Sequence, residues 1–310
     1  MGQFLKKCAL FLIIGVFIAE IITRMFFITS DIPSRFIDEK GIQKYIPNQT
    51  GKWKGGNHGW SINEQGWPGD LPESYNNLIT IIGDSFIENF MNPEECHQAV
   101  FLKNLVPELN FMEASRSGVS FIEAMEITKE LDSLSPRLQL IFMHNSDLEE
   151  SILQLKKHQD ITQLDINNKK IIHGELKSPG LKSILYNWKF VYYLYNRLQS
   201  GQPKNTKTQN AKITVPLPNS NEEQNIRESI KLLLEYTISN YNIEDKVLVF
   251  RPDANTEVIK LTKEMGFKTL HLQITNDDSW SFDYDNHWTC IGHQKAAEQV
   301  SKFLKSYHHF

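Results

Sequence analysis

Short apolar runs alternate with amphipathic runs over most of the chain. Five runs are apolar almost throughout, which is typical of strands buried on both faces of a parallel sheet: residues 77–83, 110–115, 138–144, 246–252 and 269–275. Segments with apolar residues at helical spacing lie between and after them, at 99–109, 121–131, 222–241, 255–266 and 292–307. This alternation predicts an α/β fold, a doubly wound domain whose five-stranded parallel sheet is covered by helices on both faces.

The beginning of the chain has a different pattern, because residues 8–28 are apolar with few interruptions. This stretch is as long as the roughly 20 residues that an α-helix needs to cross a bilayer. Lys6 and Lys7 precede it, and lysines before a first span favour a cytoplasmic N-terminus. We therefore expect one transmembrane helix in the cytoplasmic (inner) membrane, with the rest of the chain on the periplasmic or extracytoplasmic side.

Two charges interrupt this apolar segment. Glu20 and Arg24 are four residues apart, so they can pair on one face of a helix, and Arg24 can reach toward the headgroups. A cleaved signal peptide is the alternative. Cleavage after Ala19 would leave the bulky Phe17 where signal peptidase needs a small residue. The pattern favours an uncleaved anchor.

Composition divides the chain further. We expect residues 1–30 to be the membrane anchor and residues 31–76, rich in Gly, Asn and Trp, to be an irregular lead-in. The α/β domain then covers residues 77–310, with an insertion at 147–241 that interrupts the alternation. Within the insertion, a polar stretch near 200–213 lacks the apolar residues needed to fold alone, which predicts a mobile loop.

Charge and motifs exclude several classes of function. The formal net charge is −4, and the sequence has no sustained cluster of Lys and Arg. Binding to phosphates needs clustered basic side chains, so nucleic acid is not an expected partner. Zinc, calcium, P-loop and dinucleotide motifs are absent from the sequence, so we expect neither a metal nor a cofactor. Of the three cysteines, Cys8 lies in the anchor, and Cys96 and Cys290 form the one possible disulfide of an exported domain; spacing leaves their pairing open.

Candidate chemistry lies at the carboxyl ends of the predicted strands. Ser85, in the tripeptide Gly-Asp-Ser, closes the first strand, where a strand-to-helix turn can expose a nucleophilic hydroxyl. A serine nucleophile needs a base and a group that orients the base. His287 follows the last predicted strand in what we expect to be a loop, and Asp285 or Asp283 can turn back on its imidazole.

An acyl-transfer site also needs donors for an oxyanion. The Ser85 N–H is one, and the loops after the second and third strands offer Gly118 and the Asn145 side chain. His293, at the start of the last helix, is expected to be a packing or helix-start residue and not a catalytic one.

Together these residues resemble the four sequence blocks of the SGNH (GDSL-like) hydrolases. Gly-Asp-Ser follows the first strand, a Gly the second and an Asn the third, and a His precedes the last helix. The resemblance implies a flavodoxin-like three-layer α/β/α sandwich, with Ser85 as nucleophile, His287 as base, and Gly118 and Asn145 completing the oxyanion hole. The lead-in and the anchor resemble the membrane-tethered bacterial branch of this family.

Two departures from the family pattern affect single residues. The usual last block has Asp three residues before His, where this chain has Tyr284, so Asp285 must serve in a D-x-H variant, with Asp283 as the other candidate. The third block usually reads G-x-N-D, and Ser146 stands in the Asn place with Asn145 one residue early. Both assignments stay open at this point.

The resulting expectation is a serine esterase that acts on ester-linked acyl groups, in particular O-acetyl groups of an envelope polysaccharide. A polysaccharide O-acetyltransferase with the same Ser-His-Asp residues is one alternative, and a non-catalytic scaffold of a polysaccharide export complex is another. Aromatic residues able to line a sugar groove, or equally to pack in the core, are Trp53, Trp60, Trp67, Tyr284 and Trp288.

Overall fold

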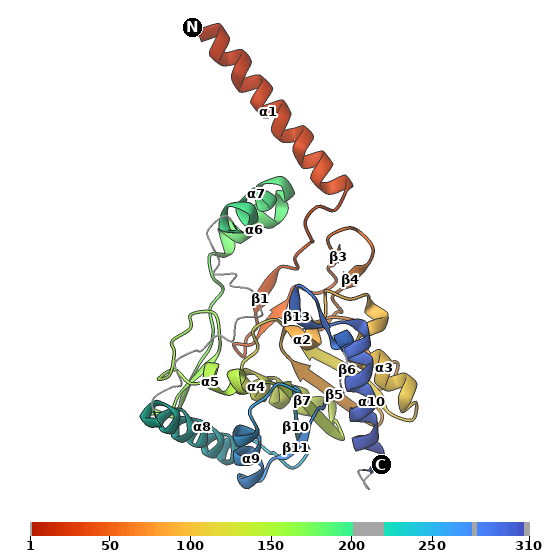
Figure 1. Ribbon diagram of the computed structural model, residues 1–310, viewed down its shortest axis with the longest axis vertical. Coiled ribbons are helices and arrows are strands. Elements are labelled where there is room, and N and C mark those ends of the chain that lie inside the picture. The colour runs from red at the N-terminus through yellow and green to blue at the C-terminus, as the bar shows by residue number, and fades with distance from the viewer. Residues whose placement is uncertain (1, 201–219, 275–277, 307–310) are drawn as a thin grey trace. The chain divides into compact units, whose positions relative to one another are not determined.

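A computed structural model describes residues 2–200, 220–274 and 278–306 of the chain (Figure 1). The chain divides into two compact units, which are described separately. One contains the described residues of Met1–Ser34, Thr50–Gly59 and Ser178–Leu217, and the other those of Arg35–Gln49, Trp60–Lys177 and Pro218–Phe310. The mobile loop predicted near 200–213 lies, after Ser200, outside the described residues.

The larger unit is built on one parallel sheet of five strands: β5 (Leu78–Gly83), β6 (Asn110–Ser115), β7 (Leu138–Met143), β10 (Lys246–Phe250) and β11 (Lys268–His271). Their order in the sheet is β11-β10-β7-β5-β6, and all pairs of neighbours are parallel. In chain order this is 2-1-3-4-5, the flavodoxin-like arrangement. The predicted fold class is therefore confirmed by the topology.

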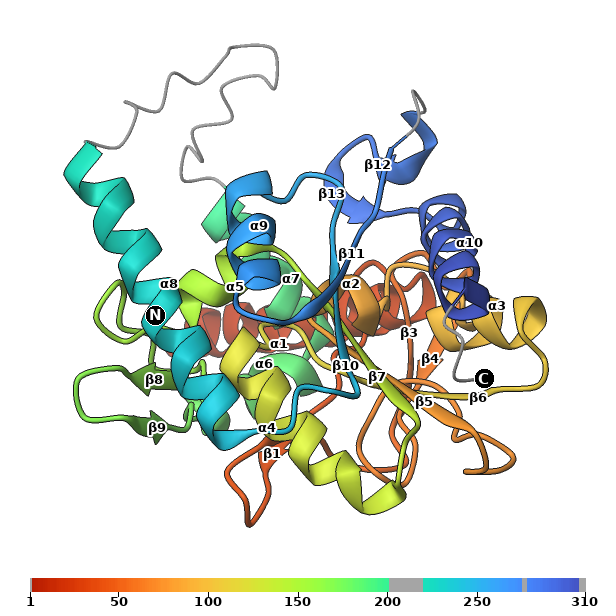
Figure 2. The same ribbon diagram turned by 90° about the horizontal axis from the view of Figure 1, so that it is seen from below.

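Helices cover both faces of this sheet (Figure 2). One face packs against α3 (Gln98–Leu105) and α10 (Cys290–Ser306). The other face packs against four helices: α4 (Phe121–Leu131), α5 (Asn145–Glu150), α8 (Ser220–Asn240) and α9 (Thr256–Glu264). The three layers place the carboxyl ends of the strands, and the loops that follow them, along one edge of the sheet.

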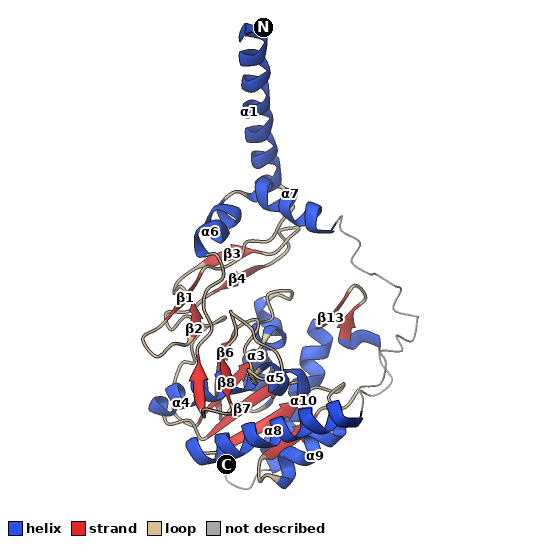
Figure 3. Cartoon of the chain, turned by 90° about the vertical axis from the view of Figure 1, so that its left-hand side faces the viewer, coloured by secondary structure: helices blue, strands red, loops and turns tan. Residues whose placement is uncertain are grey.

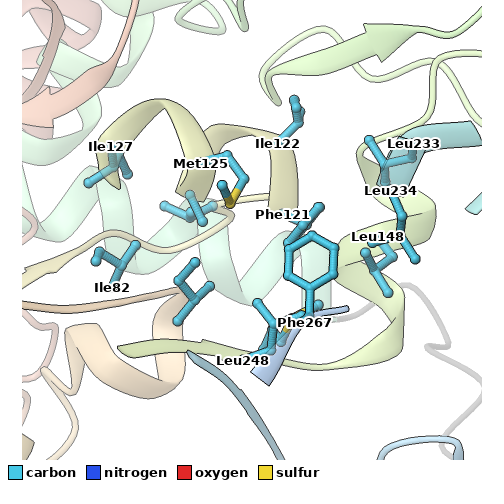
Figure 4. Close-up of a cluster of buried hydrophobic side chains, with 14 of the residues drawn as sticks. Ile82, Phe121, Ile122, Met125, Ile127, Leu148, Leu233, Leu234, Leu248 and Phe267 are labelled. Carbon is cyan, nitrogen blue, oxygen red and sulfur yellow. The ribbon is translucent and has the colours of Figure 1, made fainter. Parts of the chain in front are cut away.

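The side chains of β5 show why the strand is mostly apolar. Ile82 points into the cluster on the α4 side, while Ile79 and Ile81 point into the cluster on the α3 side. Because successive side chains of a strand alternate between faces, a sheet with two covered faces favours apolar residues on both, and the buried Thr80 is accommodated by a hydrogen bond to Gln139. Figure 4 shows the α4-side cluster, where Phe121 and Met125 meet residues from α5 and α8.

Short elements occupy the segments predicted as lead-in and insertion. They are β1 (Arg35–Ile37), β2 (Gln43–Tyr45), β3 (Thr50–Lys52), β4 (Gly59–Ser61), β8 (Gln163–Asp165) and β9 (Lys170–Ile172). After β11 the chain forms a short helical turn, η3 (Asp278–Trp280), and a hairpin of β12 (Ser281–Phe282) with β13 (Asp285–Trp288). Turns η1 (Glu94–Cys96) and η2 (Asp132–Leu134) precede α3 and follow α4.

The smaller unit contains α1 (Gly2–Met25), α6 (Pro179–Asn187) and α7 (Lys189–Ser200) (Figure 3). α1 is long and apolar enough to cross a membrane, with a mean hydropathy of 2.2 over its most apolar window, so it is a candidate membrane anchor or signal sequence. The predicted pairing within it is present, because the Arg24 guanidinium lies 2.7 Å from the Glu20 carboxylate.

The sequence of residues 185–199, within the insertion, predicts one helix, and this prediction is wrong in one respect. The helix is broken at Trp188, whose backbone is extended, into α6 and α7. The cause lies far away in the sequence: the Glu20 carboxylate accepts the N–H groups of Lys189 and Phe190 at the start of α7. A helix that continued through these residues would need both N–H groups for its own carbonyls.

Candidate functional site

Ser85 lies at the carboxyl end of β5, where the chain turns into the single-turn helix α2 (Ser85–Glu88). The turn is tight. A Cβ on Gly83 would lie 2.6 Å from Cγ1 of Ile87, so glycine is the residue that allows this close approach. Asp84 is the N-cap, and its carboxylate accepts the Phe86 N–H at 2.9 Å. The Gly-Asp-Ser sequence thus forms a strand-to-helix turn with the serine at the first helical position.

The structure brings together three predicted site residues that are far apart in the sequence. Nε2 of His287 lies 2.8 Å from Oγ of Ser85, and Nδ1 lies 2.5 Å from Oδ1 of Asp285. A carboxylate only accepts hydrogen bonds, so Nδ1 carries the proton and Nε2 is left to accept the serine hydroxyl. This is the arrangement of a nucleophile, a base and an orienting group.

His287 lies in strand β13, not in a loop as the sequence suggested. Asp285 starts that strand, two positions before His287, and side chains two apart in a strand point to the same face. The strand therefore produces the D-x-H contact directly, and the Asp285 carboxylate also accepts the His287 N–H at 2.9 Å. Asp283, the other candidate, is exposed in the hairpin turn and makes none of these contacts with His287.

Sequence reasoning missed two residues here: Phe86, which stacks on this imidazole, and Arg251, which lies over the Phe86 ring. The Phe86 ring stacks on His287 with centroids 4.6 Å apart, and the Arg251 guanidinium lies 3.7 Å from the Phe86 centroid. Arg251 directly follows β10 and is held by Asp253 through two hydrogen bonds. Its place after a strand was a signal available in the sequence.

The loop that carries Gly118 is tied to the serine helix. Glu88, the last residue of α2, accepts the Ser117 N–H at 2.6 Å and the Tyr45 hydroxyl. Burial and the nearby Glu88 charge raise the pKa of Tyr45, so this phenol stays a neutral donor. No sequence motif marks Glu88, because its partners come from separate segments of the chain.

Arg116 fixes the same loop from inside. It is 1 % exposed, pairs with Glu123 at 2.6 Å and donates to the Ser117 carbonyl. Gly118 follows with φ of +80°, a left-handed conformation that favours glycine. The backbone of the predicted oxyanion loop is therefore fixed by a buried ion pair.

Asn145 begins α5 and has partners other than the serine. Its side-chain NH₂ donates to Glu149 at 3.4 Å, and its side-chain carbonyl accepts the Asn255 N–H at 3.3 Å. The Ser146 hydroxyl contacts Nδ1 of His144 at 2.9 Å. The oxyanion role of Asn145 stays a prediction, as does the choice between Asn145 and Ser146.

Two carboxyl groups near the serine have raised pKa values: Asp84, half-buried in the serine turn, and Asp147, buried in α5. Burial raises the pKa of Asp84, and burial followed by the charge of Asp84 raises the pKa of Asp147 well above its usual range. Asp147 accepts the His144 N–H at 2.7 Å, as part of a capping box on α5. These two groups therefore hold protons more tightly than ordinary aspartates.

His293 and most of the candidate sugar-binding aromatics are packing residues. His293 is buried in α10, where the Gln98 amide contacts both its ring and its carbonyl. Burial lowers the pKa of His293 to about 3. Trp60, Trp67 and Trp288 are at most 5 % exposed and belong to the core, so the sugar-groove interpretation is wrong for these three.

Cross-links hold the strand that carries His287. Cys96 and Cys290 form a disulfide, which joins the segment after α2 to the start of α10. The Asn92 side chain donates to the Trp288 carbonyl at 2.9 Å. Cys8 is free and exposed. The pairing left open by the sequence is thus present in the fold.

Within the described ranges, no group of three or more His, Cys, Asp or Glu side chains is arranged to hold a metal ion. No family model matches the chain. No curated protein matches it either.

Several solved structures are similar to the chain. An acetyl xylan esterase from Butyrivibrio proteoclasticus is 13 % identical, with 79 % of this chain and 67 % of the esterase covered and a TM-score of 0.40. A family two carbohydrate esterase from Clostridium thermocellum, in complex with cellohexaose, is 13 % identical over 77 % of this chain and 66 % of that one, with a TM-score of 0.36. A GDSL-like lipase from Bacteroides thetaiotaomicron is 9 % identical over 76 % and 92 %, with a TM-score of 0.35. At these identities and TM-scores the similarity does not identify an activity, which must come from the site itself.

Proposed function

We propose that the chain is a serine esterase of SGNH type that hydrolyses ester-linked acyl groups. The observation that carries this proposal is the hydrogen-bonded series Ser85–His287–Asp285 at the carboxyl edge of the sheet. A serine in a turn has no need of an imidazole at 2.8 Å that is in turn fixed by a carboxylate at 2.5 Å. Nucleophilic acyl transfer needs all three.

The proposed reaction has two stages. Oγ of Ser85 attacks the ester carbonyl while Nε2 of His287 takes the hydroxyl proton, and Asp285 stabilises the imidazolium that forms. The imidazolium then gives this proton to the leaving alcohol, which leaves an acyl-enzyme. Water attacks the acyl-enzyme with His287 again as base, and the acid and free Ser85 are released.

The proposed oxyanion hole uses the Ser85 N–H and the Gly118 N–H, with the Asn145 side chain as third donor. Its support is the rigidity of the loop around Gly118, held by Arg116 and by the Glu88–Ser117 hydrogen bond. Fixed donors stabilise developing charge without reorganisation, which is the usual source of this catalytic effect.

We propose O-acetyl groups of an envelope polysaccharide as the substrate. The support is the N-terminal apolar helix, which would hold the site at the membrane, and the disulfide, which is typical of domains outside the cytoplasm. The proposed location is the outer face of the cytoplasmic membrane, with α1 as a single uncleaved span.

The test is labelling and turnover with the full chain. A fluorophosphonate probe should label the protein, and p-nitrophenyl acetate should be hydrolysed. Ser85→Ala should abolish labelling and lower kcat by several orders of magnitude. Ser133→Ala, a matched change at an exposed serine on the surface, should alter neither. Equal labelling of wild type and Ser85→Ala would contradict the proposal.

A further inference from the structure

We propose that α6 and α7 form a second membrane contact, which lies flat in the boundary between headgroups and acyl chains of the outer leaflet, against the outer end of α1. The proposal rests on α1 crossing the bilayer and is independent of the esterase activity. It concerns the smaller unit alone, whose helices are shown in Figure 3.

A set of polar contacts made by Glu20 and Arg24, here called the polar joint, connects both helices to the last turns of α1. The Glu20 carboxylate caps α7 by accepting the N–H groups of Lys189 at 3.1 Å and Phe190 at 2.7 Å. Arg24, paired with Glu20, donates to the carbonyl of Asn187 at the end of α6. The depth of α6 and α7 is therefore set by the depth of residues 20–24.

An aromatic contact places the break between α6 and α7 beside the apolar segment of α1 and not after the end of that segment. The Trp188 ring meets the Phe17 ring edge to face with centroids 6.3 Å apart. Phe17 lies eight residues before Met25, the last residue of α1, which is about 12 Å along a helix axis. If α1 crosses the bilayer, Trp188 lies among the acyl chains of the outer leaflet beside Phe17, and the polar contacts at residues 20–24 lie closer to the headgroups.

The exposed side chains of α6 and α7 are large and apolar. Those with at least 41 % of their surface exposed are Leu181, Ile184, Trp188, Leu194, Tyr195 and Leu198. Leu181 and Ile184 are three residues apart and share one face of α6, and Leu194 and Leu198 are four apart and share one face of α7. A lipid surface is the occupant that fits, because α7 packs against α1, and the last turns of α1 also expose large apolar side chains, Ile21, Ile22 and Met25.

The joint also explains the charges in the span. Glu20 and Arg24 would be costly in hydrocarbon as isolated groups. Here the carboxylate receives two backbone N–H groups and a guanidinium, and the guanidinium also binds a carbonyl. Interfacial helices that supply these partners satisfy the polar groups at the end of the span.

The experiment uses the full chain with Cys8→Ser, so that one introduced cysteine carries an environment-sensitive nitrobenzoxadiazole dye. The test sites are Ile184→Cys and Leu198→Cys, which are 59 % and 77 % exposed. Phe11→Cys, in the middle of α1, is the membrane control, and Lys260→Cys, exposed on α9 of the larger unit, gives a reference for the dye on that unit. Each variant is reconstituted in phosphatidylcholine–phosphatidylglycerol vesicles with and without lipid brominated on its acyl chains.

We expect both test sites to show blue-shifted emission that brominated lipid quenches, as at Phe11→Cys. Water-like, unquenched emission at both test sites would overturn the proposal, because α6 and α7 would then stand clear of the bilayer. A blue shift without quenching would overturn it in favour of coverage by protein, such as a second copy of the chain. Absence of quenching at Phe11→Cys would overturn it together with the membrane span itself.

Discussion

The contacts between site residues depend on the position of each residue in its strand or turn. Asp285 and His287 share one face of β13, so the carboxylate meets Nδ1 and Nε2 is directed to Ser85. The hydroxyl is presented by a turn that Gly83 makes possible. Substitution of Ser85, His287 or Asp285 is therefore expected to break a direct contact between two side chains.

We expect Asp285→Asn to lower kcat by about 10⁴-fold, because the amide stabilises the wrong imidazole tautomer and cannot stabilise the imidazolium. The matched variant Asp283→Asn removes a carboxylate of the same hairpin that does not contact the imidazole. Steady-state hydrolysis of p-nitrophenyl acetate measures both. A large loss in Asp283→Asn with normal turnover in Asp285→Asn would reverse the assignment.

His293 should make the fold sensitive to acid. Burial lowers its pKa to about 3, whereas an unfolded histidine titrates near 6.5. Between these pH values the unfolded chain binds a proton that the folded chain does not, so the free energy of unfolding falls as pH drops from about 6.5 to about 3. The slope from this one group is at most about 1.4 kcal/mol per pH unit.

The variant His293→Gln should flatten this acid limb. Urea unfolding at a series of pH values measures the effect, and His173→Gln, a histidine at an exposed position, is the control that should leave the limb unchanged. Identical pH dependence in wild type and His293→Gln would show that His293 does not titrate with a lowered pKa.

At the scale of elements, the sequence predicted what local pattern determines. The strands β5, β6, β7, β10 and β11 were found because a sheet with two covered faces is built mostly from apolar residues. The helices that cover the sheet were predicted from apolar residues at helical spacing, because each helix buries one face against the sheet. The strand β13 was missed, since a four-residue strand paired with two residues gives no periodic signal.

The break between α6 and α7 was missed for a different reason. Its cause is the Glu20 carboxylate, which is distant in the sequence and competes for the N–H groups of Lys189 and Phe190. The buried partners around Gly118 were also invisible, because Glu88 and Arg116 act through contacts between segments. Local pattern predicts elements, and tertiary contacts decide where some of them end.

The disulfide should stabilise the element that carries His287. We expect the double variant Cys96→Ser, Cys290→Ser to lower the free energy of unfolding by about 2–5 kcal/mol. We also expect a lower kcat, because β13 ends shortly before the cross-linked Cys290 and would be held less firmly without the disulfide. Thermal unfolding and turnover measure the two effects. Cys8→Ser changes a free, exposed thiol and should change neither; equal stability of all three proteins would contradict the prediction.

For the whole molecule, two independent features predict the same orientation in the membrane. Lys6 and Lys7 precede the apolar helix, which favours a cytoplasmic N-terminus. Disulfides such as Cys96–Cys290 are typical of compartments that oxidise thiols, which favours a domain outside the cytoplasm. Within the smaller unit, Glu20 of α1 is hydrogen-bonded to the start of α7, and cleavage after Ala19 would remove Phe17, the partner of Trp188.

We therefore expect the full chain, with a C-terminal epitope tag, to stay in the membrane fraction after alkaline carbonate washing when expressed in a bacterial host. Protease added to spheroplasts should remove the tag, and maleimide labelling under denaturing conditions should find Cys96 and Cys290 oxidised. Changing Lys6 and Lys7 to Glu removes the basic signal and should leave part of the population inverted, with a protected tag and reduced cysteines. A tag protected from protease in the wild-type chain would contradict the orientation, and with it the proposal that the site faces envelope polysaccharide. Release of the wild-type chain by carbonate would contradict the membrane span, on which the proposed membrane contact of α6 and α7 depends.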